Sequence, residues 1–204
     1  IDFNAGQKTI ENRIKELKLV PQNVQRTLEW YETRHKLITA SNAFKAFESE
    51  SMKNQLIYEK CQPIKVFEEE ITTDSFSKII KIEQHVNINT AMHWGQKYEP
   101  VSVLYYENRF KTKVSDYGCI PHSTYNFLGA SPDGIISEPF LPNFGRMIEI
   151  KNIVNREIDG IPKKEYWIQM QLQMETCDLN ECDFLETRFT DYENYNEFKK
   201  DGSF

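Results

Sequence analysis

Asp133, Glu149 and Lys151 combine two acids and one base at a spacing that can build a metal-assisted hydrolytic site. Side chains alternate between the two faces of an extended strand, so Glu149 and Lys151 point to one face of the predicted strand 146–154. Asp133 starts the preceding strand-like run, and the loop between the runs is short enough for a hairpin. Neighbouring carboxylates repel each other unless a cation neutralises them, and hard oxygen ligands favour Mg²⁺ or Mn²⁺. A lysine beside them can orient or deprotonate an attacking water and stabilise a phosphorane-like transition state.

This spacing is also open to a plainer interpretation. The pair Pro132-Asp133 is followed, sixteen residues on from the aspartate, by Glu149-Ile150-Lys151. The arrangement resembles the PD-(D/E)XK nuclease superfamily, but so few fixed positions also arise by chance. In that case the segment is a surface turn followed by an amphipathic strand with a solvated glutamate and a solvated lysine.

Further segments favour the first interpretation, because they follow the order found in the lambda exonuclease and YqaJ-like viral recombinase family of that superfamily. Each motif is weak singly, but five ordered motifs that span roughly residues 25–190 form a specific resemblance. The motifs are WYETRHKLITAS at Trp30–Ser41, WGQKYE at Trp94–Glu99, GASPDG at Gly129–Gly134, EIK at Glu149–Lys151 and QMQLQM at Gln169–Met174.

The resemblance implies an α/β fold of the PD-(D/E)XK type, with a mixed central β-sheet flanked by helices and further helices at the N-terminus. It also implies a Mg²⁺ cofactor, with Mn²⁺ as a substitute, and a lysine that acts directly in the reaction. The implied catalytic residues are Glu99, Asp133, Glu149, Lys151 and Gln169, and the implied metal ligands are Glu99, Asp133, Glu149 and the backbone carbonyl of Ile150.

Two of these assignments concern residues on helices. Without the resemblance, Glu99 and Gln169 would be ordinary solvent-facing helix residues. In the family pattern Glu99 joins the strand acids at the metal, and Gln169 holds the attacking water or the scissile phosphate. Gln171 lies about 200° from Gln169 around a helix, so the two glutamines cannot face the metal equally.

Arg34 and Ser41 match family positions that bind the terminal 5′ phosphate of DNA. A guanidinium fork suits a phosphate monoester, and a hydroxyl at a helix start adds the favourable field of the helix terminus. The structural alternative is that Ser41 only caps its helix and Arg34 only pairs with a nearby acid. The chain departs from the family at one point. The family has a further acid shortly before its Ser-Pro-Asp-Gly motif, whereas the corresponding stretch here, His122-Ser123-Thr124, has none, although His122 could contribute a ligand.

The resemblance implies a 5′→3′ exonuclease that acts on linear double-stranded DNA in recombination or DNA end processing. Its partners would be double-stranded DNA ends and a single-strand annealing protein. Whether the protein forms a homo-oligomer stays open. The expected location is intracellular, in the cytoplasm or nucleus of a host cell if the protein is viral. Two alternatives stay open as well: an endonuclease, resolvase or RNA-cutting nuclease on the same core, and a catalytically silent DNA-end-binding module.

The composition excludes several other classes of protein. The 25 basic and 31 acidic residues leave a net charge of −6, which argues against a general polyanion binder. The four cysteines form no CxxC pair, which argues against a zinc ribbon, an iron–sulfur site or a redox dithiol and favours reduced thiols. No run approaches the roughly 18–20 apolar residues of a membrane span, so no membrane partner is expected.

The elements that position these residues follow from hydrophobic spacing and from turn residues. A long helix is expected to carry Trp94, Tyr98, Val101 and Tyr105 on one face and to be bent or interrupted at Pro100. We expect helices at 7–20, 23–33, 42–47 (capped by Ser41), 52–60, 91–108 and 165–177, and strands within 111–137 and at 146–154 and 182–190.

These elements predict one nuclease domain over residues 1–204. It would consist of N-terminal helices over 1–60, a variable polar excursion at 61–89 and a catalytic core over 90–190. Because the chain begins with an isoleucine rather than a methionine, we expect it to be a fragment of a longer protein.

Overall fold

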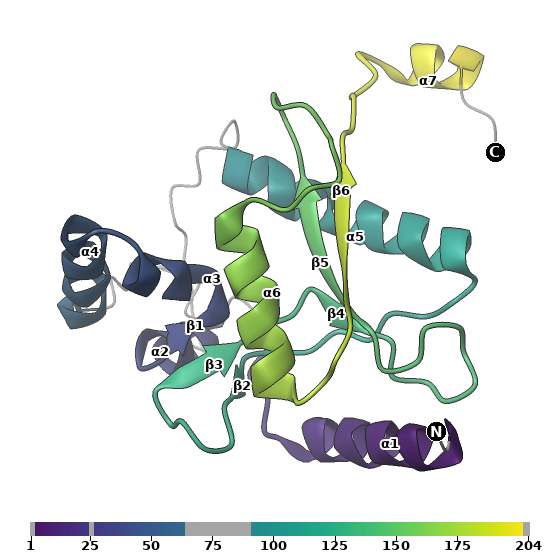
Figure 1. Ribbon diagram of the computed structural model, residues 1–204. Coiled ribbons are helices and arrows are strands. Elements are labelled where there is room, and N and C mark those ends of the chain that lie inside the picture. The colour runs from purple at the N-terminus through teal and green to yellow at the C-terminus, as the bar shows by residue number, and fades with distance from the viewer. Residues whose placement is uncertain (1–2, 25–26, 64–90, 202–204) are drawn as a thin grey trace, which may run out of the picture.

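The protein has a mixed α/β fold in which two small sheets are covered by helices (Figure 1). The computed structural model describes residues 3–24, 27–63 and 91–201. The helices are α1 (Phe3–Leu19), α2 (Leu28–His35), α3 (Ala40–Ala43), the 3₁₀ helix η1 (Phe44–Phe47), α4 (Glu50–Cys61), α5 (Ala91–Phe110), α6 (Lys164–Cys177) and α7 (Tyr195–Asp201). The strands are β1 (Ile38–Thr39), β2 (Ile120–Pro121), β3 (Leu128–Ala130), β4 (Gly134–Ile135), β5 (Met147–Asn152) and β6 (Cys182–Thr187).

The expected mixed sheet is divided into two three-stranded sheets, in the orders β1-β3-β2 and β4-β5-β6. In the first, β1 runs parallel to β3, whereas β2 runs antiparallel to it. In the second, β4 and β5 form the expected antiparallel hairpin, and β6 returns parallel to β5 after the crossover through α6. Each sheet is therefore mixed, which confirms the predicted α/β class.

Strand β5 alternates between two packing environments, as the period of two predicts. Ile148 and Ile150 are buried in a cluster with Tyr106 of α5. Met147 belongs to a second cluster, which includes Leu17 of α1. Figure 1 shows α5 and α6 on opposite sides of β5, so the strand that carries the predicted catalytic residues is covered on both faces.

Helix α5 differs from the prediction in two details. The helix is not broken at Pro100, which lies inside it. Its buried face carries Tyr98, Ser102 and Tyr106, four residues apart, whereas Val101 is exposed to 43%. The exposed Tyr105 departs from the predicted face in the same way. The sheet accepts the polar Ser102 because its hydroxyl donates to Asn152 Oδ1 at 2.6 Å, so a rule based on apolar residue types selects the wrong face beyond Tyr98.

The N-terminal region also differs in detail. Helix α2 begins at Leu28, after Thr27, whose hydroxyl accepts a hydrogen bond from Trp30 N. The predicted cap at Ser41 is wrong, because Thr39 occupies the N-cap position of α3 and Ser41 lies within the helix. Ile38 and Thr39 pair with β3 as strand β1, and α3 follows directly at Ala40. The hydroxyl of Ser41 is therefore not needed as a cap.

Most of the predicted excursion at 61–89 lies outside the described residues, since only Cys61 at the end of α4 and the next two positions belong to them. Strands β5 and β6 are each shorter than predicted, and they end at Asn152 and Thr187. None of the helices in the described ranges is long and apolar enough to cross a membrane.

Candidate active site

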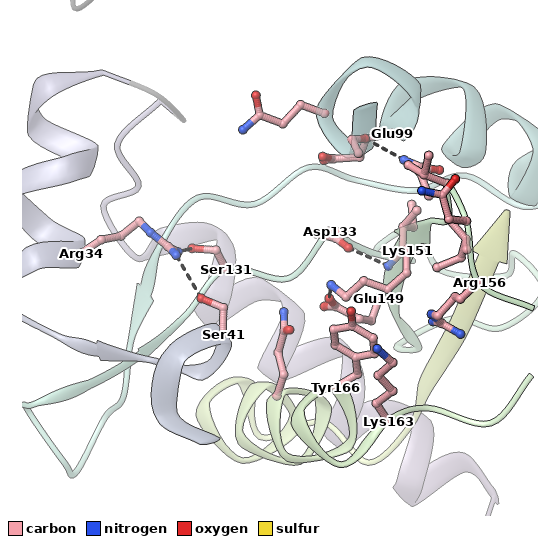
Figure 2. A pocket seen from close by; sticks show the side chains of 18 of the residues that line it. Arg34, Ser41, Glu99, Ser131, Asp133, Glu149, Lys151, Arg156, Lys163 and Tyr166 are labelled. Atoms are coloured by element: carbon pink, nitrogen blue, oxygen red, sulfur yellow. Dashed lines mark hydrogen bonds and ion pairs between the residues drawn. The ribbon is translucent and has the colours of Figure 1, made fainter. Parts of the chain in front are cut away.

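A cavity of about 630 Å³ opens between α5, α6, β5 and the α2–α3 region (Figure 2). It is lined by all eight residues that the family resemblance implied for the reaction, the metal and the 5′ phosphate. Seven of these contribute side chains, from helices and strands that are far apart in the sequence. They are Arg34, Ser41, Glu99, Asp133, Glu149, Lys151 and Gln169, and Ile150 also lines the cavity.

Asp133 and Glu149 meet because β4 and β5 form a hairpin in which Gly134 lies opposite Ile148. The Oδ2 atom of Asp133 accepts a hydrogen bond from the backbone nitrogen of Ile150 at 2.6 Å. Burial, followed by the charge of Glu149, raises the pKa of Asp133 well above its usual value. Glycine is required after this aspartate, because a Cβ atom at position 134 would collide with the side chain of Val114.

Glu149 is completely buried, and both of its carboxylate oxygens have partners. Oε1 contacts the ammonium group of Lys151, while Oε2 accepts a hydrogen bond from Gln173 Nε2 at 2.8 Å. Burial on its own would lower the pKa of Lys151, but the charges of Glu149 and Asp133 outweigh it and raise that pKa. Lys151 is therefore held in its charged form, and its Nζ lies 4.9 Å from the centre of the Tyr166 ring.

Glu99 reaches the cavity from α5, and its charge contributes to the raised pKa of Asp133. A buried polar network fixes α5 against the sheet at this point. Asn152 Nδ2 donates to the carbonyl of Gly95 at 2.6 Å, one helical turn before Glu99. The hydroxyls of Ser102 and Thr187 both donate to Asn152 Oδ1 at 2.6 Å. We call Glu99, Asp133, Glu149 and Lys151 the acid cluster.

The donors of the acid cluster fit a divalent cation in chemical type. Three carboxylates line the same cavity, and after burial the charges of Glu149 and Glu99 contribute to the raised pKa of Asp133. Within the described ranges, no group of three or more His, Cys, Asp or Glu side chains is arranged to hold a metal ion as it stands. In this arrangement the ammonium group of Lys151 lies against Glu149 Oε1, where a cation would bind.

Arg34, Ser41 and Ser131 form a second group, which we call the arginine clamp. The two terminal nitrogens of Arg34 donate to Ser131 Oγ at 2.7 Å and to Ser41 Oγ at 3.2 Å. The guanidinium carbon lies 4.5 Å from the centre of the Trp30 ring, and burial lowers the pKa of Arg34. Arg34 thus donates to two hydroxyls rather than to the acid that the structural alternative required.

The two glutamines on α6 behave as the helical period requires. Gln169 is buried at the cavity wall, whereas Gln171 is exposed. Sequence reasoning did not single out Ser131, Tyr166 or Gln173. Signals for two of them were present, because Ser131 lies inside the Gly-Ala-Ser-Pro-Asp-Gly motif and Gln173 lies one helical turn after Gln169.

His122 does not line the cavity. Its ring is buried, and Nδ1 accepts hydrogen bonds from the backbone nitrogens of Thr124 and Tyr125 at 2.9 and 3.1 Å. It therefore shapes the turn between β2 and β3. A neighbouring cavity of about 470 Å³ shares Glu99 and Asp133 with the first and is also lined by Asp116, an acid from outside the His122–Thr124 stretch.

The basic residues near the cavity are only partly directed towards it. Arg156 and Lys163 line the cavity, although Arg156 also forms an ion pair with Glu186. Lys164 instead pairs with Glu48 at 2.7 Å. Lys45 in η1 likewise pairs with an acid, Glu59, at 2.7 Å.

Comparisons with known proteins agree with this architecture. Residues 29–180 match the YqaJ-like viral recombinase domain. The chain is 30% identical over 203 residues to uncharacterized protein R354 of Acanthamoeba polyphaga mimivirus. That match covers 94% of this chain and 34% of the relative, so the chain spans about a third of the length of the curated relative.

Two solved structures are similar. One is an alkaline exonuclease (LHK-Exo) from Laribacter hongkongensis, with 28% sequence identity, a TM-score of 0.57, and coverage of 79% of this chain and 74% of that chain. The other is LHK-Exo in complex with dAMP, with 28% identity, a TM-score of 0.54, and coverage of 78% and 73%. The match over residues 29–180, together with the cavity that these residues build, shows that the chain belongs to the YqaJ-like viral recombinase domain family.

Proposed function

We propose that this domain is a metal-dependent deoxyribonuclease that degrades linear double-stranded DNA from its 5′ ends, in recombination or DNA end processing. One observation carries the proposal: the acid cluster and the arginine clamp line the same cavity. A site for hydrolysis and a site for a terminal phosphate are thus adjacent. Family membership and the likeness to an alkaline exonuclease support the same activity.

Glu99, Asp133, Glu149 and the carbonyl of Ile150 would hold the divalent cation, which we propose to be Mg²⁺, with Mn²⁺ as a substitute. A cation bound there supplies charge neutralisation for the phosphate and activation of the attacking water. Lys151 would stabilise negative charge on the scissile phosphate, since its ammonium group lies beside Glu149 in the same cavity. Gln169 would orient the water or the phosphate from α6.

The arginine clamp would bind the terminal 5′ phosphate. Arg34 now donates to the two serine hydroxyl oxygens, and the oxygens of a phosphate monoester can replace these as acceptors. The similar protein LHK-Exo has been solved with dAMP, which carries a phosphate of the kind that such a clamp would recognise. Digestion from 5′ ends would leave a 3′ single-stranded overhang, the substrate of a single-strand annealing protein.

The decisive experiment uses linear duplexes, with a 5′ phosphate or a 5′ hydroxyl, beside a covalently closed circle. Each substrate carries one label and is incubated with Mg²⁺ or with EDTA. We expect Mg²⁺-dependent loss of the linear duplexes alone, faster with the 5′ phosphate. Nicking of the closed circle would instead indicate an endonuclease, and binding of DNA ends with no cleavage of any substrate would indicate a silent end-binding module.

A further inference from the structure

Gln173 lies on α6, beneath the cavity, and its side chain is completely buried. Its Nε2 atom donates to Glu149 Oε2 at 2.8 Å and lies 3.4 Å from the carbonyl oxygen of Ser131. Its own carbonyl, Oε1, has no hydrogen-bond partner in the part of the chain that the structure describes. A buried amide that leaves one end unsatisfied costs free energy, so its donor end must provide a compensating function.

The two carboxylate oxygens of Glu149 have different partners. Oε2 accepts from the buried amide of Gln173. Oε1 contacts Lys151, and Figure 2 shows Glu149 and Lys151 side by side in the cavity. A neutral N–H donor lowers the cost of burying the charge without cancelling that charge. Because Gln173 is buried, a cation or DNA entering the cavity can replace the contact to Lys151 but not the contact to Gln173.

We propose that Gln173 is a positioning residue that holds the carboxylate of Glu149 in one orientation, so that Oε1 alone is presented to the divalent cation. This inference rests on the proposed function for the role of the cation. The second contact, to the Ser131 carbonyl, has the same effect on the turn that leads into Asp133. One amide on α6 therefore fixes both segments that carry the strand acids.

Three variants test this assignment. Gln173→Met keeps the approximate volume and removes the donor, whereas Gln173→Glu keeps the shape and replaces the donor by an acceptor. Gln171→Met is the matched control, because this residue is exposed two positions earlier on the same helix. Thermal unfolding and far-ultraviolet circular dichroism in EDTA check that each variant is folded.

The first measurement is the affinity for Mn²⁺ without DNA, from electron paramagnetic resonance and calorimetry, and the second is kcat and KM on a linear duplex. For Gln173→Met we expect about tenfold weaker Mn²⁺ binding and a similar fall in kcat, with KM changed less than about twofold, since residues that orient metal ligands typically have such effects. Gln173→Glu should bind Mn²⁺ more weakly still, with a lower kcat. Gln171→Met should match the wild type in both Mn²⁺ affinity and kcat. If Gln173→Met does not fold, Gln173→Asn, which keeps the amide on a shorter chain, should give an intermediate loss.

The outcomes separate the two proposals. If the wild type binds Mn²⁺ and cleaves DNA, and a folded Gln173→Met variant equals it in both, the positioning role is overturned while the nuclease stands. If the wild type itself neither binds Mn²⁺ nor cleaves DNA, the proposed function fails first. A loss of kcat with unchanged Mn²⁺ affinity would also overturn the positioning role, since the effect would then not act through Glu149.

Discussion

On one side of the cavity, Asp133 directly precedes β4 and Glu149 lies in β5 of the same hairpin, sixteen residues further on. On the other side, Arg34 reaches Ser131 across 97 positions of sequence, and Ser41 is exposed. Ile148 and Ile150 anchor the acid cluster in the apolar core, whereas the arginine clamp is held by hydrogen bonds between side chains. A buried core can keep like charges together at a cost, while hydrogen bonds at a surface can be exchanged for those of a ligand.

This difference separates two kinds of consequence. Changes in the acid cluster should alter both the chemical step and the stability of the fold, because Glu149 is completely buried. Changes in the arginine clamp should alter only the choice of DNA end.

Lys151→Ala should lower kcat by about 10²–10³-fold, because it removes the cation that stabilises charge on the phosphate. Binding of a 5′-phosphorylated duplex in EDTA should be largely retained, since the arginine clamp is intact. Single-turnover cleavage and fluorescence anisotropy measure the two quantities. Lys164→Ala removes the same charge from an exposed pair with Glu48 and should cleave normally. Turnover near the wild-type rate in Lys151→Ala would contradict the catalytic role.

Arg34→Ala should abolish the preference for a 5′ phosphate over a 5′ hydroxyl. The expected loss is about 10–100-fold in kcat/KM on the phosphorylated duplex, as for a charged hydrogen bond of about 1.5–3 kcal/mol. The rate on the hydroxyl end should change little, because the acid cluster is untouched. Arg109→Ala, at the exposed end of α5, is the control for loss of one positive charge. An equal fall on both ends would place Arg34 in the chemical step instead.

Ser131→Ala and Ser41→Ala should each reduce the same preference by about 2–10-fold, the range of a neutral hydrogen bond of about 0.5–1.5 kcal/mol. We expect the larger effect at Ser131, because its contact to Arg34 is shorter, 2.7 Å against 3.2 Å. Competition between phosphorylated and hydroxyl duplexes in one reaction resolves such small ratios. Ser123→Ala, on the exposed turn between β2 and β3, should leave the ratio unchanged.

Asp133→Asn should stabilise the metal-free protein, because the amide no longer repels Glu149 yet can still accept from the Ile150 nitrogen. A relief of about 1 kcal/mol would raise the melting temperature by about 2–4 °C in EDTA. The raised pKa gives the sign with pH: above the ordinary value of 3.8 the unfolded chain releases this proton first, so wild-type stability falls as pH rises towards the native pKa. That slope should be smaller in Asp133→Asn and unchanged in Glu138→Gln, an exposed control.

Much of the acid cluster could be predicted from the sequence, because it depends on local periodicity. Alternation along an extended strand brings Glu149 and Lys151 to one face, and a short loop brings Asp133 beside them. The period of the helix likewise separates Gln169 from Gln171. These relations follow from backbone geometry over a few residues, so they hold whatever packs around the segment.

The arginine clamp and the supports of the acid cluster depended on the tertiary structure. No local rule joins Arg34 to Ser131, or Gln173 to Glu149, because each contact requires two elements to pack at one distance and orientation. The buried face of α5 shows the same limit. Hydrophobic type favoured Val101, but the sheet presents Asn152 to the helix, and hydrogen bonding to this amide selects Ser102 instead. Residue types and periodicity therefore specify which groups can react, whereas packing between distant segments decides which partners hold them in place.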